Sequence, residues 1–128
     1  MEPSREDQTV RLKIPARAEY VGLARLALAA LCALTSLGPG DVADLKLAVS
    51  EAANDLLAPR SSDADPAAPA GSLRFELELE AARLTLRVEA DQPRPEVAEE
   101  RELSRAIIEA TVDEWHYEAG ATRLVKYL

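Results

Sequence analysis

Two acidic side chains at a helical spacing are the residues of this chain best placed to do chemistry. Glu51 and Asp55 lie four residues apart in the segment Asp41–Leu57, DVADLKLAVSEAANDLL. At that spacing, two side chains stack on one face of an α-helix, one turn apart. Such a carboxylate pair could hold a magnesium ion or activate a hydroxyl group. It could equally be a solvated surface pair, and the two residues alone leave these alternatives open.

The segment that positions this pair has the pattern of an amphipathic helix. One apolar stripe recurs at intervals of three and four residues: Val42, Leu45, Val49, Ala52 and Leu56. We expect Asp41, which follows a Gly-Pro-Gly turn, to be the N-cap of this helix. Pro59 predicts that the helix ends by Leu57 or Ala58, because proline cannot continue it.

The other elements follow from hydrophobic periodicity. Alternating residues predict strands at Thr9–Ile14, Leu73–Leu79, Leu84–Val88, Glu114–Ala119 and Thr122–Leu128. Helical spacing predicts further helices at Ala18–Leu37 and at Glu96–Thr111, the second with an apolar face of Val97, Leu103, Ile107 and Ala110. This order predicts an α+β fold, a two-layer sandwich in which a mixed β-sheet is covered on one face by helices.

Composition agrees with one compact unit. The chain has 128 residues and 48% hydrophobic content, enough to bury a core. We expect residues 1–8 to be a flexible N-terminus, residues 9–128 a single domain, and Pro59–Gly71 a flexible linker within it. The single cysteine, Cys32, excludes an internal disulfide, which agrees with a reducing cytosol. Its place in an apolar helix indicates that the side chain packs in the core.

Charge and hydropathy exclude two kinds of partner. A formal net charge of −8 without a cluster of Lys and Arg argues against nucleic acid, whose phosphates require such a cluster. Val21–Leu37 is rich in alanine and leucine, but it contains Arg25 and is short for a bilayer. It is therefore expected to be a buried helix and not a membrane span. The polar start of the chain does not have the pattern of a signal peptide.

Three segments, in order along the chain, resemble one known family. DLKLAVSEA (Asp44–Ala52) is similar to the N-box helix of the anti-sigma factor serine kinases, which are small bacterial proteins of the Hsp90/histidine-kinase ATPase (GHKL) superfamily. Lys13–Leu31 resembles that family's first strand and first helix, and Val112–Leu128 resembles its last two strands. The resemblance implies the histidine-kinase-type ATPase fold, also called the Bergerat fold, and a cytoplasmic protein. It also implies a homodimer, for which Thr9–Ile14 offers an edge strand.

The same resemblance assigns roles at the nucleotide site, with departures. Glu51 stands at the position of the catalytic glutamate. Four residues later, where the family has a magnesium-binding asparagine, this chain has Asp55, while Asn54 is one residue early and about 100° away around the helix. Ala90 aligns with the aspartate that reads adenine. Asp91 is one residue late and would face the other side of the strand, so it could contact adenine only if a bulge re-aimed it.

The glycine-rich boxes that bind ATP in this family are missing. The chain has no glycine between Ser72 and Ala119, although glycine lets the backbone approach a nucleotide and adopt positive φ. We therefore expect no cofactor, and a binding protein whose kinase machinery has decayed. The alternative is an active serine kinase that uses ATP and magnesium, with Glu51 as base and Asp55 on the metal. Whether the chain is an enzyme stays open at this point.

Arg25 is the candidate partner-binding residue. In members of the family that bind sigma factors, an arginine at this place on the first helix contacts both sigma and the STAS-domain anti-anti-sigma protein, and the interval from Arg25 to Glu51 matches the family without a gap. The resemblance thus implies transcription regulation by partner switching. Two plainer alternatives remain: Arg25 as an ordinary surface arginine, and the chain as a remnant of the fold without a sigma partner.

Overall fold

The computed structural model describes residues 8–57, 71–91, 98–118 and 120–128. The elements in chain order are β1 (Gln8–Pro15), a short 3₁₀ turn η1 (Ala18–Tyr20), α1 (Val21–Cys32), α2 (Pro39–Leu56), β2 (Ser72–Leu79), β3 (Arg83–Ala90), α3 (Ala98–Thr111), β4 (Glu114–Glu118) and β5 (Ala121–Tyr127). The predicted order of strands and helices is confirmed. The N-terminal residues 1–7 and most of the predicted linker, residues 58–70, lie outside the described residues.

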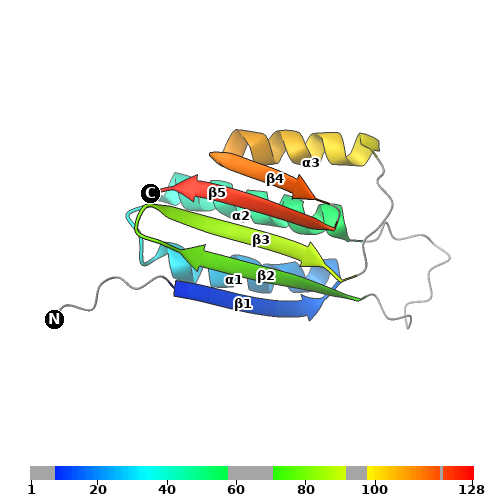
Figure 1. Cartoon of the computed structure of the whole chain (residues 1–128), viewed down its shortest axis with the longest axis horizontal. Coiled ribbons are helices and arrows are strands. Elements are labelled where there is room, and N and C mark those ends of the chain that lie inside the picture. The colour runs from blue at the N-terminus through cyan, green and yellow to red at the C-terminus, as the bar shows by residue number, and fades with distance from the viewer. Residues whose placement is uncertain (1–7, 58–70, 92–97, 119) are drawn as a thin grey trace.

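The five strands form one sheet in the order β1-β2-β3-β5-β4, with α1 and α2 behind it and α3 beside β4 (Figure 1). All four neighbouring pairs are antiparallel, so the prediction of a mixed sheet was wrong, while the α+β class and the helix-covered face are confirmed. The reason lies in the connections. Helices α1 and α2 join β1 to β2, and the two strands run in opposite directions. Strands β3 and β4, which α3 joins, run in the same direction, but β5 lies between them and is antiparallel to both.

The core lies between the sheet and the helices. Leu73, Phe75 and Leu77 of β2 point into it, as the alternation predicted, and each is at most 2% exposed. The apolar stripe of α2 packs against these side chains from the helix layer. Leu45 and Val49 are buried there, together with the alanines of the same helix. The sheet is thus apolar on one face only, and its register is determined there.

The ends of α1 and α2 differ from the predicted ends. Helix α1 stops at Cys32 and not at Leu37, because Thr35 Oγ1 donates to the Cys32 carbonyl at 2.7 Å and the Leu37 amide donates back to Thr35 Oγ1 at 3.2 Å. Helix α2 begins at Pro39, and Gly38 is its N-cap in place of Asp41. Proline is favoured at the first helical position because its missing N–H would have no partner there.

Helix α3 presents a different face to the core from the one predicted. Ser104 and Ile108 are buried, while the predicted core residue Leu103 is 68% exposed and Ala110 is exposed. Val97 lies outside the described residues. The prediction failed because it counted only apolar side chains, and a serine whose hydroxyl has a partner can be buried at little cost.

Cys32 is buried on α1, and this burial raises the pKa of its thiol, which agrees with a packing role. None of the helices in the described ranges is both long and apolar enough to span a membrane.

Two leucines on α1 test this description of the core. Leu28 is 0% exposed and Leu26 is 69% exposed. Leu28→Ala should lower the free energy of unfolding by about 2–5 kcal/mol, because it leaves a cavity between α1 and the sheet. Leu26→Ala, which removes the same atoms from the surface, should change it by less than about 0.5 kcal/mol. Urea unfolding followed by circular dichroism measures both, and equal losses would contradict the assigned orientation of α1.

Candidate functional site

The candidate site is built on the part of α2 that does not face the sheet. Glu51 and Asp55 lie one turn apart on this helix and both are half-buried, whereas Asn54 between them is exposed. The side chains that pack into the core, such as Ala52 and Leu56, hold the rotation of the helix about its axis. The predicted carboxylate pair therefore exists as a rigid feature of α2.

Helix α3 supplies the hydrogen-bond partner of Glu51. Ser104 Oγ donates to Glu51 Oε2 at 2.8 Å, from a serine that is only 9% exposed. Helix α3 packs mainly against α2, so this bond lies in the seam between two helices. The carboxylate that the resemblance identifies as a general base is thus engaged by a hydroxyl of the same chain.

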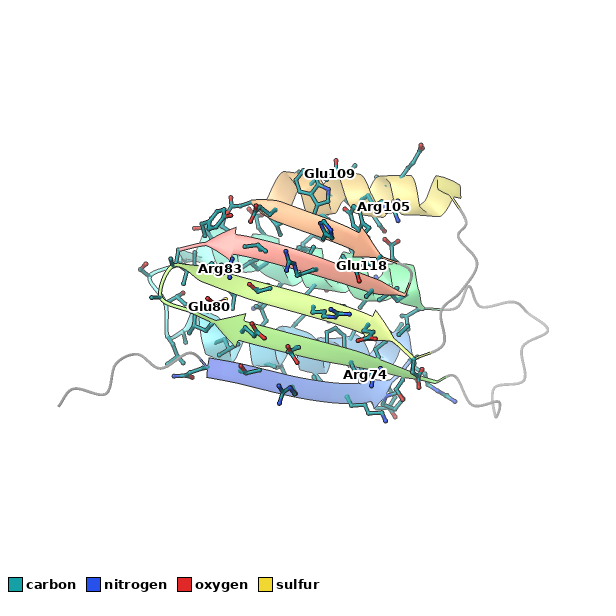
Figure 2. All side chains as sticks on the ribbon, in the orientation of Figure 1. Arg74, Glu80, Arg83, Arg105, Glu109 and Glu118 are labelled. Carbon is teal, nitrogen blue, oxygen red and sulfur yellow. The ribbon has the colours of Figure 1, made fainter. Side chains whose placement is uncertain are left out.

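A second contact fixes α3 on the other side of this seam. The Arg105 guanidinium carbon lies 4.4 Å from the centroid of the Tyr117 ring on β4, a cation–π arrangement. Figure 2 shows Arg105 and Glu109 on α3, alongside β4. The Tyr117 pKa is raised to about 12, chiefly by burial and further by the negative charges of Glu109 and Asp55, while Arg105 acts in the opposite direction. Asp55 therefore lies within electrostatic range of β4.

Arg25 reaches the same helix from α1. Its Nη1 donates to Ser50 Oγ at 3.0 Å, and Ser50 in turn donates to the Lys46 carbonyl one turn earlier at 2.8 Å. The guanidinium also lies over Gly22, where an added Cβ would be 3.4 Å from Arg25 Nη2. The exposed arginine is thus positioned by α2, next to the residue that precedes Glu51.

Asp91 is hydrogen-bonded at the end of strand β3. The Ser72 amide donates to Asp91 Oδ1 at 2.8 Å, and the Asp91 amide donates to the Ser72 carbonyl at 3.2 Å, so this residue closes the end of the β2–β3 ladder. The backbone hydrogen bond from Ser72 lowers the Asp91 pKa. The register is regular up to Ala90, which packs into the core, and Asp91 is exposed.

The described residues meet only part of what a magnesium nucleotide requires. Asp55 is an oxygen ligand of the kind magnesium takes. However, within the described ranges no group of three or more His, Cys, Asp or Glu side chains could hold a metal ion, and Glu51 already has Ser104 as a partner. The described glycines with positive φ, Gly71 and Gly120, lie before β2 and before β5. Among the described residues, Glu51 and Asp55 of α2 are the two that match the roles that the resemblance implies at a nucleotide site.

The arrangement of sheet and helices is also found in a solved structure. A solved structure of the RsbU and RsbW domains of Rv1364c from Mycobacterium tuberculosis is similar over 94% of this chain and 32% of that chain, with a TM-score of 0.65 and 17% sequence identity. No protein-family model matches the chain.

Part of the chain is similar in sequence to curated RsbW proteins. The chain is 38% identical over 50 residues to a serine-protein kinase RsbW of Bacillus cereus (strain AH187). It is 36% identical over 50 residues to the protein of the same name from Bacillus thuringiensis (strain Al Hakam). Each match spans 39% of this chain and 31% of the relative. The chain is homologous to the RsbW serine-protein kinases over this stretch, which is less than a third of their length.

Sequence reasoning missed three residues of this site. Ser104, Arg105 and Tyr117 tie α3 to α2 and β4, yet none belongs to a motif that we could identify. One signal was present, because Ser104 lies four residues before Ile108 and so shares its helical face. Recognising it required the correct face of α3.

The raised pKa of Tyr117 predicts an alkaline loss of stability. A group whose pKa is higher in the folded state stabilises the protein fully below its unfolded pKa of about 10, and this contribution is lost as the pH rises towards about 12. Tyr117→Phe should therefore lose less stability than the wild type between about pH 10 and about pH 12, measured as urea midpoints. Tyr20→Phe, which removes a hydroxyl from an exposed ring, is the control. An equal loss in the wild type and Tyr117→Phe would contradict the assigned burial.

Proposed function

We propose that this chain is an anti-sigma-type regulatory binding protein of bacterial transcription. It would sequester a sigma factor and release it when a STAS-domain anti-anti-sigma protein competes for the same surface, without ATP turnover. Two facts support the class of function: the homology to RsbW serine-protein kinases and the GHKL-type fold. The action without phosphorylation is our inference from the site.

The observation that carries this inference is the hydrogen bond between Ser104 and Glu51. A general base must be within hydrogen-bond reach of the hydroxyl it deprotonates. Here Glu51 accepts a bond from Ser104 at 2.8 Å, in a seam held by Arg105 on Tyr117. To act on a substrate, Glu51 would first have to exchange this partner. The absence of glycine between Ser72 and Ala119 in the sequence points the same way.

Helix α1 is the proposed partner surface. Arg25 is exposed and held by Ser50, so its guanidinium is presented in a restricted orientation. Three leucines of α1 and the turn after it are exposed as well: Leu23, Leu26 and Leu34. Apolar side chains around an arginine are the usual composition of an interface hot spot. A partner carboxylate could pair with Arg25 while apolar groups cover these leucines.

We further propose a cytoplasmic homodimer that pairs through the edge of the sheet. β1 is an edge strand in the described sheet, and Val10 and Leu12 are only partly buried along it. An unpaired edge with such side chains can accept the strand of a second copy.

The active kinase remains the second candidate, because Glu51 and Asp55 keep the spacing of one helical turn and the relatives are named as serine-protein kinases. Titration calorimetry with ATP and magnesium separates the two. We expect no binding in the micromolar range, since the glycine-rich boxes are missing. An RsbW protein from Bacillus cereus serves as the positive control. A micromolar dissociation constant for this chain, lost in Asp55→Ala, would establish the kinase alternative.

The partner surface is tested by Arg25→Ala. Affinity capture from the native cell should first yield a sigma factor or a STAS protein on the wild type. Arg25→Ala should weaken that complex by about 2 kcal/mol or more, while the free energy of unfolding changes by less than about 1 kcal/mol. Arg25→Lys should recover only part of the loss, because lysine lacks the bidentate fork.

Arg83→Ala is the matched control for this experiment, since Arg83 is exposed on β3 and bonded to Glu80 at 3.2 Å, on the face of the sheet away from the helices. It should leave partner binding unchanged. If Arg25→Ala binds the captured sigma factor or STAS protein as tightly as the wild type, helix α1 is not the interface.

A further inference from the structure

The solvent-facing side of helix α1 is apolar. Leu23 is 47% exposed and Leu26 is 69% exposed, while Ala27 is half-buried and Ala30 is exposed. The α1 sequence, VGLARLALAALC, contains one charged residue, Arg25. A helix at the surface of a globular protein normally presents charged and polar side chains opposite its core face, and a helix that is apolar all round is normally buried. The composition of α1 therefore indicates a contact that a single copy of the chain does not make.

Helical geometry places most of these side chains on a different side of α1 from Arg25. At about 100° per residue, Leu23, Ala27 and Ala30 lie about 140–160° around the helix from Arg25. Arg25 is directed towards α2, since its Nη1 donates to Ser50 Oγ at 3.0 Å. Leu23, Ala27 and Ala30, which we call the α1 flank, therefore lie on the side of α1 away from α2.

The α1 flank lies at the β1 edge of the molecule. In the helix layer, α1 lies behind β1 and β2, and α2 lies further towards β3 and β5 (Figure 1). The side of α1 away from α2 is therefore the side of β1, the edge strand of the described sheet. On β1, Val10 and Leu12 face the helix layer and are only partly buried, whereas Leu77 and Phe75 opposite them on β2 are at most 2% exposed. The flank and these two β1 side chains thus form one apolar border.

A second copy joined to the edge of β1 would bring its own α1 to packing distance. Directly opposed residues of an antiparallel pair point to the same face, so a twofold β1–β1 junction places both helix layers on one side of the joined sheet. Neighbouring strands are about 4.8 Å apart. Because α1 contacts both β1 and β2, the two α1 helices would be separated by about two strand spacings, or about 9.6 Å. Packed helices are about 8–10 Å apart.

We propose that the α1 flank is the helix layer of a homodimer interface and is covered by the α1 flank of a second copy of this chain. The inference rests on the edge-strand homodimer proposed above and adds α1 to it. Strand pairing alone is marginal in water and needs packing against a helix. A strand from an unrelated protein could pair with β1, but it would leave Leu23 exposed. The second copy is the partner that extends the sheet and covers the flank together, and the small side chains Ala27 and Ala30 permit the close approach.

This dimer leaves the Arg25 side of α1 accessible. The surface proposed above for a sigma factor or a STAS protein then narrows to Arg25 and to Leu26, which lies about 100° from it around the helix. The apolar groups that cover Leu23 are those of the second copy. A partner could therefore bind the assembled dimer.

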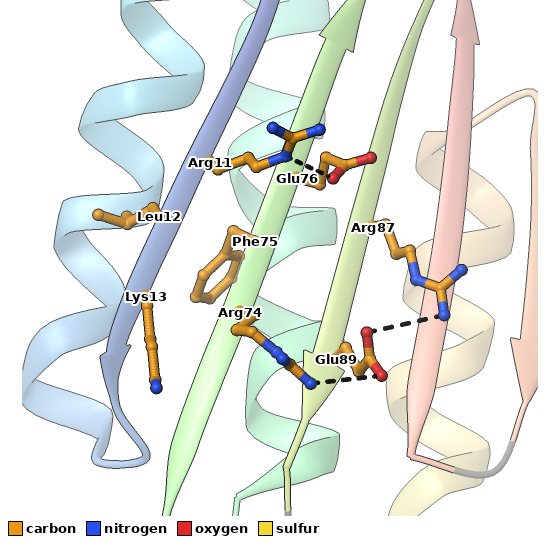
Figure 3. Close-up of a pocket in the computed structure, with 8 residues that line it drawn as sticks. All are labelled: Arg11, Leu12, Lys13, Arg74, Phe75, Glu76, Arg87 and Glu89. Atoms are coloured by element: carbon orange, nitrogen blue, oxygen red, sulfur yellow. Dashed lines mark hydrogen bonds and ion pairs between the residues drawn. The ribbon is translucent and has the colours of Figure 1, made fainter.

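The open face of β1 determines how the dimer responds to salt. Arg11 and Lys13 lie on this face (Figure 3), and the second copy would bring the same two cations close to them. Glu76 accepts a hydrogen bond from Arg11 at 3.0 Å, which offsets part of the repulsion. Salt screens exposed charges and leaves the apolar contact in place. The dimer should therefore tighten as the ionic strength rises, whereas an interface held by ion pairs would weaken.

Sedimentation equilibrium of the full-length chain at micromolar concentrations tests this interface. Leu23→Glu should raise the dissociation constant of the dimer about tenfold or more, because twofold symmetry removes two leucines from the interface and buries two carboxylates. Ala30→Glu, on the same flank, should weaken the dimer as well. Far-UV circular dichroism checks that both variants keep the fold.

Leu47→Glu is the matched control, because Leu47 is 44% exposed, close to the 47% of Leu23, but belongs to α2, on the other side of α1 from the β1 edge. It should change the dissociation constant by less than about twofold. A wild-type chain that stays monomeric would overturn the homodimer and this inference together. A wild-type dimer that Leu23→Glu and Ala30→Glu weaken no more than Leu47→Glu would overturn only the α1 contact. A dimer that loosens as salt is added would overturn the apolar interface. Capture of a sigma factor or a STAS protein tests the proposed function separately.

Discussion

The burial of α2 is the constraint on which the rest of the structure depends. This helix contacts α1, α3 and the sheet, and its side chains Ala48, Ala52 and Ala53 are fully buried. Small side chains let neighbouring elements approach closely, so the helix axis and its rotation are determined by packing alone. The polar residues of α2 then lie where this helix meets α1 on one side and α3 on the other. Because half-buried polar groups need partners, each seam must supply one.

The two seams of α2 differ in what they leave accessible. On the α1 side, Ser50 holds Arg25, and the charged end of that arginine stays exposed. On the α3 side, Ser104 holds Glu51, and the bond lies between two packed helices. One side of α2 therefore leaves a charged group exposed to solvent, while the other side engages a carboxylate between two helices. This difference is the structural basis of the proposal that the chain binds a partner without phosphorylating it.

The sequence predicted the elements whose pattern is apolar and failed where polar contacts decide. The stripe of α2 and the alternation of β2 gave the correct faces, because only burial determines them. The face of α3 was wrong since Ser104 is buried through a hydrogen bond to a residue 53 positions earlier in the chain, which no local pattern contains. The cation–π contact between Arg105 on α3 and Tyr117 on β4 likewise joins two elements that no local pattern connects. The predicted N-cap, Asp41, lies in the first turn of α2, and Lys126 lies 3.8 Å from its carboxylate.

The two faces of the sheet differ in how strongly the fold restricts their side chains. The face towards the helices must be apolar, whereas the open face can carry many kinds of polar side chain. A shift of one residue in register would exchange the two faces, and the apolar face prevents this shift. Once Leu73, Phe75 and Leu77 hold the register, the side chains opposite them on the open face can change without altering the fold. Arg87 opposite Arg123 is then not a requirement of the architecture, and it works slightly against it. The same register places Arg87 opposite Glu76 and Arg74 opposite Glu89, so opposite charges on the next strand offset this repulsion.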